Sequence, residues 1–372
     1  MNVVPFIVAQ TGLPVILRSG AGSSKTSLIE KFAEKMQRNF YPVFLNSRDR
    51  EDVLGYPIYN QELGEIEFKM DSSLNIKHPA VVFFDELNTA PEHVRIVAQR
   101  IINEKILGNN LLTDVWFFIA GNPPGVSAGA QPFEPAIVNR CAVFNWEPPV
   151  NWWKTFMILS GKQFYFNRLE GKKLSHETWS PNFPVLNKNL YEENLEKYIP
   201  IFVQFFSNNP QFLSEGDKTD PYCSIRSATN AVSAYCSILS VDNIEGLTKD
   251  EALIMALTSC LGESTAIKLK RFITSLDLPD PISVLEGKVP LPSEKEHDKA
   301  QIVIMSLVAK SNNVEMFNRV MKFLKEVYDK RSPELAYFAI VSMAEQAKKL
   351  PKDKLVIPRG ITNVISDKFK VF

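Results

Sequence analysis

The sequence of 372 residues carries no net charge, because 42 lysines and arginines balance 42 aspartates and glutamates. A neutral chain without an acidic or basic tail gives no general electrostatic reason to bind nucleic acid. It also lacks a run of about 18 apolar residues, the length that a membrane-spanning helix requires. We therefore expect no membrane partner and regard a nucleic-acid partner as disfavoured.

Cysteine and histidine are scarce, with four of each. The cysteines are Cys141, Cys223, Cys236 and Cys260, and no two form a C-x-x-C pair. This spacing argues against a zinc site and against a disulfide framework. The apolar N-terminus lacks the basic start and small-residue cleavage site of a secretion signal. We expect buried, reduced thiols in a cytoplasmic protein.

Residues 1–150 alternate between short apolar runs and helical patterns. Strands are predicted at 15–17, 43–45, 80–84, 115–120 and 142–144. Helical stripes follow the first run, from Leu28 to Met36, and the third, from a helix opened by Pro91. Alternation of this kind predicts an α/β fold with a doubly wound parallel sheet.

The remainder of the chain has a different pattern. Residues 151–192 are irregular and rich in aromatic residues, and we interpret them as an insertion or linker. Helical patterns then cover 250–261, 266–276, 298–309, 314–328 and 334–349. We predict four regions: an α/β domain (1–150), the insertion (151–192), an all-α region (193–285) and a helical extension (286–372).

A glycine- and serine-rich segment, Ser19 to Thr26, lies between the first predicted strand and its helix. Backbone N–H groups in such a turn can surround a phosphate. In the pattern G-x-x-x-x-G-K-[ST], the lysine contacts the β- and γ-phosphates and the threonine binds Mg²⁺. Ser19 and Ser24 replace both outer glycines, so an ordinary Ser/Gly turn remains an alternative. The candidate ATP-binding residues are Gly20, Ala21, Gly22, Ser23, Ser24, Lys25 and Thr26.

A second motif strengthens this interpretation. Four apolar residues, 81–84, end in Asp85 and Glu86. Strand carboxyl ends in an open α/β sheet face the ligand crevice. Asp85 is therefore a candidate Mg²⁺ ligand with Thr26, and Glu86 a candidate general base for water. A strand ending in a solvated acidic turn is the alternative, but it does not explain the correct order of both motifs.

The runs 85–91 (DELNTAP), 120–124 (AGNPP) and 135–140 (PAIVNR) resemble the MoxR-like branch of the AAA+ ATPases. The resemblance covers most of residues 10–150 and implies an AAA+ P-loop NTPase with a C-terminal all-α lid. It places Asn122 at sensor 1, Arg140 at the arginine finger acting in trans, and Arg226 at sensor 2, contacting phosphate in cis. A turn-forming asparagine and surface arginines are the alternatives.

The sequence suggests roles for three further features. Asn46 follows the second strand, where it can hold Glu86 away from water until a partner binds. Tyr56 lies where AAA+ relatives carry a pore loop, although packing on a local hairpin explains it as well. Residues 104–114 are predicted to form a hairpin that matches an insertion in this branch's second helix.

The resemblance implies an ATPase that remodels a protein client or acts as a chaperone. A finger acting in trans implies a homo-oligomeric ring, with six subunits expected. A separate von Willebrand factor A domain protein is an expected partner of such ATPases. Two alternatives stay open: a nucleotide-gated scaffold with little hydrolysis, suggested by Ser19 and Ser24, and a nucleic-acid motor, disfavoured by the neutral charge.

Overall fold

The computed structural model describes residues 2–20, 22–62, 64–69, 74–107, 110–123, 130–147, 154, 157–158, 169–170, 182–214 and 220–361. These residues divide into two compact units. Unit 1 comprises residues 1–191 and 211–267, and unit 2 comprises residues 192–210 and 268–372. The units group the chain differently from the predicted regions, because 211–267 of the predicted lid belong with the sheet.

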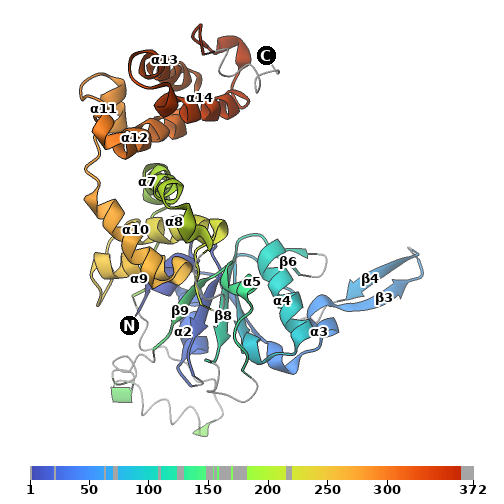
Figure 1. The fold of residues 1–372 in the computed structure, drawn as a ribbon. Helices are drawn as coiled ribbons and strands as arrows, with labels where there is room; N and C mark the ends of the chain where they lie inside the picture. Colours follow the sequence, from blue (N-terminus) through green and yellow to red (C-terminus); the bar gives the residue numbers. More distant parts are fainter. Residues whose placement is uncertain are drawn as a thin grey trace. The chain divides into compact units, whose positions relative to one another are not determined.

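Unit 1 is built on a five-stranded parallel sheet with strand order β2-β5-β8-β1-β9. This confirms the predicted doubly wound α/β fold (Figure 1). The sheet strands are β1 (Val15–Arg18), β2 (Asn39–Phe44), β5 (Ala80–Asp85), β8 (Val115–Gly121) and β9 (Ala142–Asn145). The helices of unit 1 are α1 (Val4–Ala9), α2 (Lys25–Lys35), α3 (Arg50–Leu54), α4 (Glu92–Glu104), α5 (Pro135–Val138), α8 (Ile225–Leu239) and α9 (Lys249–Leu261).

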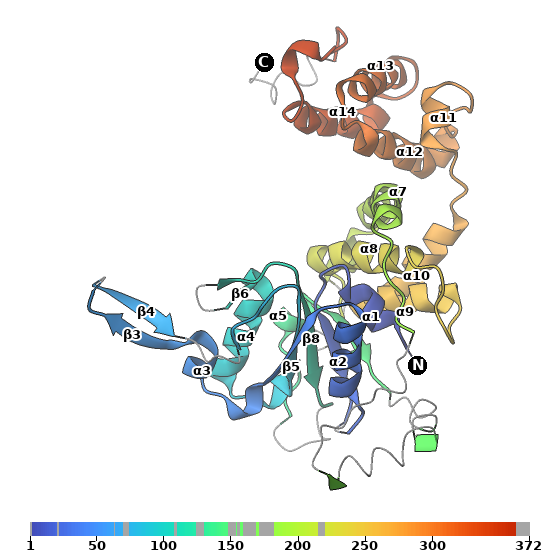
Figure 2. The same cartoon turned by 180° about the vertical axis from the view of Figure 1, so that it is seen from behind.

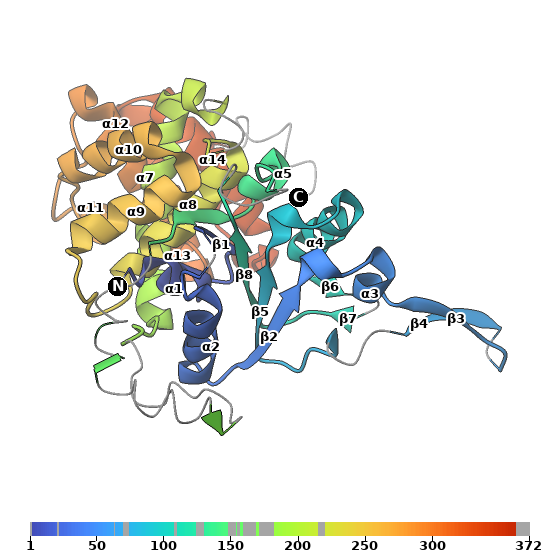
Figure 3. The ribbon, with the colours of Figure 1, turned by 90° about the horizontal axis from the view of Figure 1, so that it is seen from below.

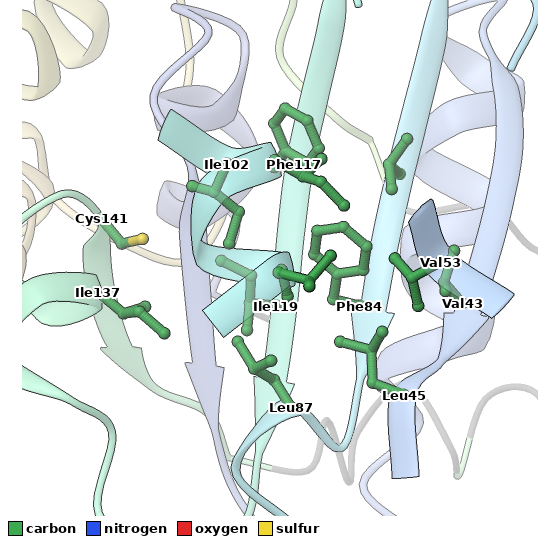
Figure 4. Packing of buried hydrophobic residues seen from close by; sticks show 14 of the residues in the cluster. Val43, Leu45, Val53, Phe84, Leu87, Ile102, Phe117, Ile119, Ile137 and Cys141 are labelled. Atoms are coloured by element: carbon green, nitrogen blue, oxygen red, sulfur yellow. The ribbon is translucent and has the colours of Figure 1, made fainter. Parts of the chain in front are cut away.

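Both faces of the sheet are covered, with α2 on one side and α4 on the other (Figure 3). Alternate residues of one strand therefore enter different cores. Phe117 and Ile119 of β8 join the cluster beneath α4, shown in Figure 4. Phe118, between them, instead packs 5.5 Å from Phe6 of α1, measured between ring centroids. Burial on both faces explains why this strand is a continuous apolar run.

Strand β2 begins earlier than predicted, at Asn39, and ends at Phe44. The predicted run 43–45 was wrong in extent, since Leu45 lies in a 3-10 turn. β2 is an edge strand with mostly exposed or half-buried residues, so its pattern is weak. Its edge position also accommodates Pro42, which would remove a ladder hydrogen bond from a central strand.

Two small hairpins extend unit 1. The strands β6 (Ile106–Leu107) and β7 (Asn110–Leu111) pair antiparallel, which confirms a hairpin within 104–114. A longer hairpin, β3 (Tyr56–Asn60) with β4 (Glu65–Lys69), projects beyond α3 (Figure 2). Tyr56 opens β3 and is 51% exposed, and its hydroxyl donates to Asp52 at 2.6 Å. Tyr56 therefore lies on a local hairpin, which was the alternative to a pore loop in the sequence analysis.

Unit 2 is entirely helical in its described part. Its helices α11 (Pro281–Leu285), α12 (His297–Lys310), α13 (Val314–Lys330) and α14 (Pro333–Ala347) include the last three predicted ones. Two helices, α7 (Lys188–Asn208) and α10 (Glu263–Ser275), each cross a boundary between the units, at 191/192 and at 267/268. The last three helices share one core around Phe317, Met321 and Ile340.

Other predictions concern the whole chain. All four cysteines are buried, and none of them forms a disulfide. No helix among the described residues is long and apolar enough to cross a bilayer. A cytoplasmic location stays a prediction. Trp152, Trp153 and Trp179 of the predicted insertion lie outside the described residues.

Candidate functional site: a phosphate loop, two carboxylates and an asparagine

The phosphate-loop segment connects β1 to the first turn of α2. Lys25 begins α2 and is buried, with 9% of its surface exposed. Its ammonium group donates to Ser19 Oγ at 2.7 Å, Ser23 Oγ at 3.1 Å and the Gly20 carbonyl at 3.1 Å. Ser19, which replaces a glycine of the pattern, thus supplies an oxygen that positions the lysine. Ala21 lies outside the described residues.

Ser24, the other glycine replacement, adopts the left-handed conformation with φ 60° and ψ 23°. A side chain is disfavoured there, whereas glycine adopts this conformation freely. The loop therefore has the backbone path that the missing glycine would favour. The Trp146 indole donates to the Ser23 carbonyl at 3.1 Å, which ties the loop to the segment after β9.

Asp85 ends β5, Glu86 follows it, and both face this loop. The Thr26 hydroxyl donates to Asp85 Oδ2 at 3.4 Å. Burial raises the pKa of Asp85, and the Glu86 charge raises it further, while Lys25 opposes both. Burial likewise lowers the pKa of Lys25, against the attraction of the two carboxylates. Removal from water thus outweighs the mutual attraction of these groups.

Glu86 is itself in the left-handed conformation, with φ 55°. Its carboxylate accepts a short hydrogen bond from the Asn46 side-chain amide. The contact anticipated between Asn46 and Glu86 is therefore present. The Glu86 backbone N–H donates to Asp85 Oδ1 at 3.0 Å, so the two acidic residues are fixed relative to each other.

Asn122 follows β8 directly and is 6% exposed. Asn88 holds it by both backbone groups: the Asn122 N–H donates to Asn88 Oδ1 at 3.1 Å, and Asn88 Nδ2 donates to the Asn122 carbonyl at 2.7 Å. Asn88 Nδ2 also donates to the Gln131 carbonyl at 2.9 Å. Sequence reasoning assigned no role to Asn88, although a buried amide beside the acidic pair was a usable signal.

These groups line one cavity of about 330 Å³ at the carboxyl edge of the sheet, which we call the P-loop pocket. Its lining includes Gly22, Ser23, Ser24, Lys25, Thr26, Asp85, Glu86 and Asn122. The described residues contain no cluster of three or more His, Cys, Asp or Glu side chains suited to a metal. Thr26 and Asp85 nevertheless suit Mg²⁺, which usually keeps several waters and binds one or two protein oxygens together with substrate phosphates.

Arg140 and Arg226 do not line the P-loop pocket. They line a second cavity of about 400 Å³, which we call the basic pocket, together with Lys105. Arg140 precedes β9, whereas the P-loop pocket lies beyond the carboxyl ends of β1, β5 and β8. The strands are parallel, so Arg140 is at the opposite edge of the sheet. Arg226, in the first turn of α8, lies beside it and does not line the P-loop pocket. Its contact with phosphate in cis stays a prediction.

Residues 14–141 match the family model of the AAA domain, dynein-related subfamily. No curated protein matches the sequence significantly. Among solved structures, a candidate ATPase from Cytophaga hutchinsonii is 18% identical, with a TM-score of 0.45 over 73% of this chain and 87% of that chain. The family match and the sheet order agree that residues 14–141 form an AAA-type P-loop NTPase domain.

Proposed function

We propose that this chain is a MoxR-like AAA+ ATPase that couples ATP binding and hydrolysis to the remodelling of a protein partner. One observation carries the proposal. Lys25, Thr26, Asp85, Glu86 and Asn122 come from three separate strand ends and line a single pocket. A structural role alone gives no reason for these groups to converge on one cavity.

The mechanism follows from the position of each group. Lys25 would contact the β- and γ-phosphates of bound ATP. Thr26 and Asp85 would hold Mg²⁺, which would neutralise phosphate charge. Glu86 accepts a proton as water attacks the γ-phosphorus, and the bond to the β-phosphate oxygen breaks to leave ADP and phosphate. Asn122, fixed by Asn88, orients the attacking water.

Arg140 fits the role of a finger that acts on a neighbouring subunit. The sheet separates it from its own P-loop pocket, so it can stabilise transition-state charge only at another copy's nucleotide. A head-to-tail contact repeated around a closed rotation makes a ring, and the MoxR-like resemblance suggests a hexamer.

The proposed protein client is supported by the hairpin β3–β4. Its exposed apolar side chains include Ile58 (44%), Tyr59 (62%) and Ile66 (62%). An isolated two-stranded hairpin is marginally stable in water, so a contact on this surface would stabilise it. A separate von Willebrand factor A domain protein remains a candidate partner on the family resemblance.

The decisive experiment measures ATP turnover per subunit across protein concentrations for the wild type, Lys25→Ala and Glu86→Gln. We expect turnover to rise with concentration in the wild type and to fall at least about 100-fold in both variants. Lys25→Ala should also lose ATP binding, while Glu86→Gln should keep it. Turnover that is the same per subunit at every concentration would refute the shared site.

A nucleotide-gated scaffold is the second candidate, and the hydrogen bond from Asn46 to Glu86 favours it. A carboxylate held by this hydrogen bond is oriented by the amide and is a weaker base toward water. The scaffold is supported if wild-type protein binds ATP, assembles, and yet hydrolyses no faster than Glu86→Gln. An Asn46→Ala variant with increased turnover would instead show that the base is restrained rather than inactive.

A further inference from the structure

The basic pocket contains positive charge without a compensating group. Lys105, Arg140 and Arg226 line it, together with Thr11, Asn103, Asn230 and Ser233, and no carboxylate is among its lining residues. Glu104, next to Lys105 in sequence, is engaged elsewhere: its carboxylate accepts from Arg100 Nε at 2.7 Å. Within the described ranges, none of the three cations forms an ion pair with an acidic side chain.

Like charges gathered in this way repel one another. Burial lowers the pKa of Arg140, and the Arg226 charge lowers it further. Among the described residues, the Arg140 guanidinium donates to one acceptor, the Ala136 carbonyl, at 2.6 Å. An anion bearing several negative charges would relieve the repulsion and accept hydrogen bonds from all three side chains.

Lys105 is held in place at unusual cost. Lys105 follows the last residue of α4 as its C-cap and has the left-handed conformation, with φ 53° and ψ 37°. Glycine adopts this conformation without strain. Its N–H donates to the Ile101 carbonyl at 2.9 Å, and its carbonyl accepts from Leu112 N at 2.6 Å. Its ammonium group lies 3.9 Å from the point where a Cβ on Gly12 would stand. The backbone is thus fixed from both sides while the charged end enters the pocket.

We propose that Lys105 is a further residue of the trans-acting site and binds, beside Arg140, the terminal phosphates of ATP held by a neighbouring copy. The inference rests on the proposed function, since it requires a shared site. Lys105 cannot contact ATP in the P-loop pocket of its own subunit. The 13 residues of α4, a length of about 20 Å, separate it from the acidic turn. The neighbour's phosphate charge would complete the pocket.

The first test is complementation between two inactive variants. Lys105→Asn removes the charge, and asparagine tolerates the left-handed conformation. We expect about a 10- to 100-fold loss of turnover, with ATP binding retained, because one hydrogen bond between charged groups is lost in the transition state. Lys105→Arg should keep most of the activity, and Lys35→Asn, an exposed lysine near the end of α2, is the matched control.

Mixing Lys105→Asn with Lys25→Ala should then restore turnover several-fold, because Lys25→Ala subunits supply an intact Lys105 to neighbours that bind ATP. A parallel mixture of Arg140→Ala with Lys25→Ala tests the shared site itself. Rescue of Arg140→Ala without rescue of Lys105→Asn overturns the role of Lys105 alone. If neither mixture gains activity, the shared site fails, and the proposal fails with it.

A binding measurement provides a readout that does not depend on turnover. In the Lys25→Ala background the P-loop pocket is disabled, so inorganic tripolyphosphate should bind at the basic pocket. We expect calorimetry to show at least about a threefold weaker affinity once Lys105→Asn is added, as one charge-assisted contact is removed. Equal affinity with and without Lys105→Asn would show that Lys105 contacts no phosphate.

Discussion

The two serines that replace the expected glycines affect the phosphate loop in different ways. Ser19 contributes a hydroxyl that accepts from Lys25, so this replacement adds a contact to the site. Ser24 contributes no side-chain cap to α2 and instead occupies a left-handed position that favours glycine. Only the second replacement therefore carries a conformational cost.

Replacing Ser24 with glycine should remove that cost. We expect Ser24→Gly to raise the free energy of unfolding by about 0.5–1 kcal/mol, because left-handed strain is relieved against some added chain entropy. ATP affinity should be equal or higher. Urea denaturation and ATP titration provide the measurements, with Ser27→Gly in the helix as a destabilising control. Lower ATP affinity in Ser24→Gly would show that the serine hydroxyl itself contacts the nucleotide.

Asp85 is expected to make stability depend on pH in the nucleotide-free protein. Its pKa is raised in the fold, chiefly by burial, so its contribution to stability is present below the ordinary aspartate pKa and is lost as pH rises through the folded value. Asp85→Asn should therefore raise the melting temperature at pH 7 while abolishing hydrolysis. The difference in melting temperature should shrink as the pH is lowered toward 4. A lower melting temperature for Asp85→Asn at pH 7 would mean that attraction to Lys25 dominates.

At the scale of elements, Asn88 connects the turn after β5 to the segment after β8. Its side chain is 1% exposed and bridges both backbone groups of Asn122 and the Gln131 carbonyl. The close fit extends to Gly121, where a Cβ would stand 2.7 Å from Asn88 Oδ1 and 2.3 Å from the Phe133 ring. The acidic turn and Asn122 are thus held as one structure.

Removing this bridge should cost both stability and activity. We expect Asn88→Ala to lower the free energy of unfolding by about 2–3 kcal/mol, because buried backbone groups lose their partners. Turnover should fall about tenfold as Asn122 loses its orientation. Asn39→Ala is the matched control, since that exposed amide also donates to two carbonyls, those of Lys77 and Pro79. An unchanged turnover in a destabilised Asn88→Ala protein would restrict Asn88 to a structural role.

The elements differ in how far the sequence predicted them. Strands β5 and β8 were identified because burial on both faces makes them continuously apolar. The acidic pair and Asn122 followed, since strand ends fix their position. The bounds of edge strand β2 were predicted incorrectly, and no bounds were predicted for hairpin β3–β4. Solvent-exposed strands carry weak hydrophobic patterns. The grouping of Lys105, Arg140 and Arg226 joins residues far apart in the sequence, which no local pattern reveals.

At the scale of the whole molecule, charge balance bears on the nucleic-acid alternative. The net charge is zero, and hairpin β6–β7 offers no basic strand residue. We expect fluorescence anisotropy to detect only weak binding to single- or double-stranded DNA at about 50 mM salt, and little change at about 200 mM, because few counterions are released. Tight binding that weakens steeply over this range would revive the motor alternative.

In the proposed ring, helix α4 would give the assembly a property that no subunit has alone. Its first turn follows Glu86 closely, and its last residue precedes Lys105 in the basic pocket. If this helix of 13 residues moved as one unit, a displacement at one end would be carried to the other. Under the proposed arrangement, the nucleotide state of each subunit would change the position of Lys105 beside the ATP of the neighbouring subunit. Successive subunits would then hydrolyse ATP in a fixed order around the ring. The direction of α4 from its first to its last residue would determine the direction of that order.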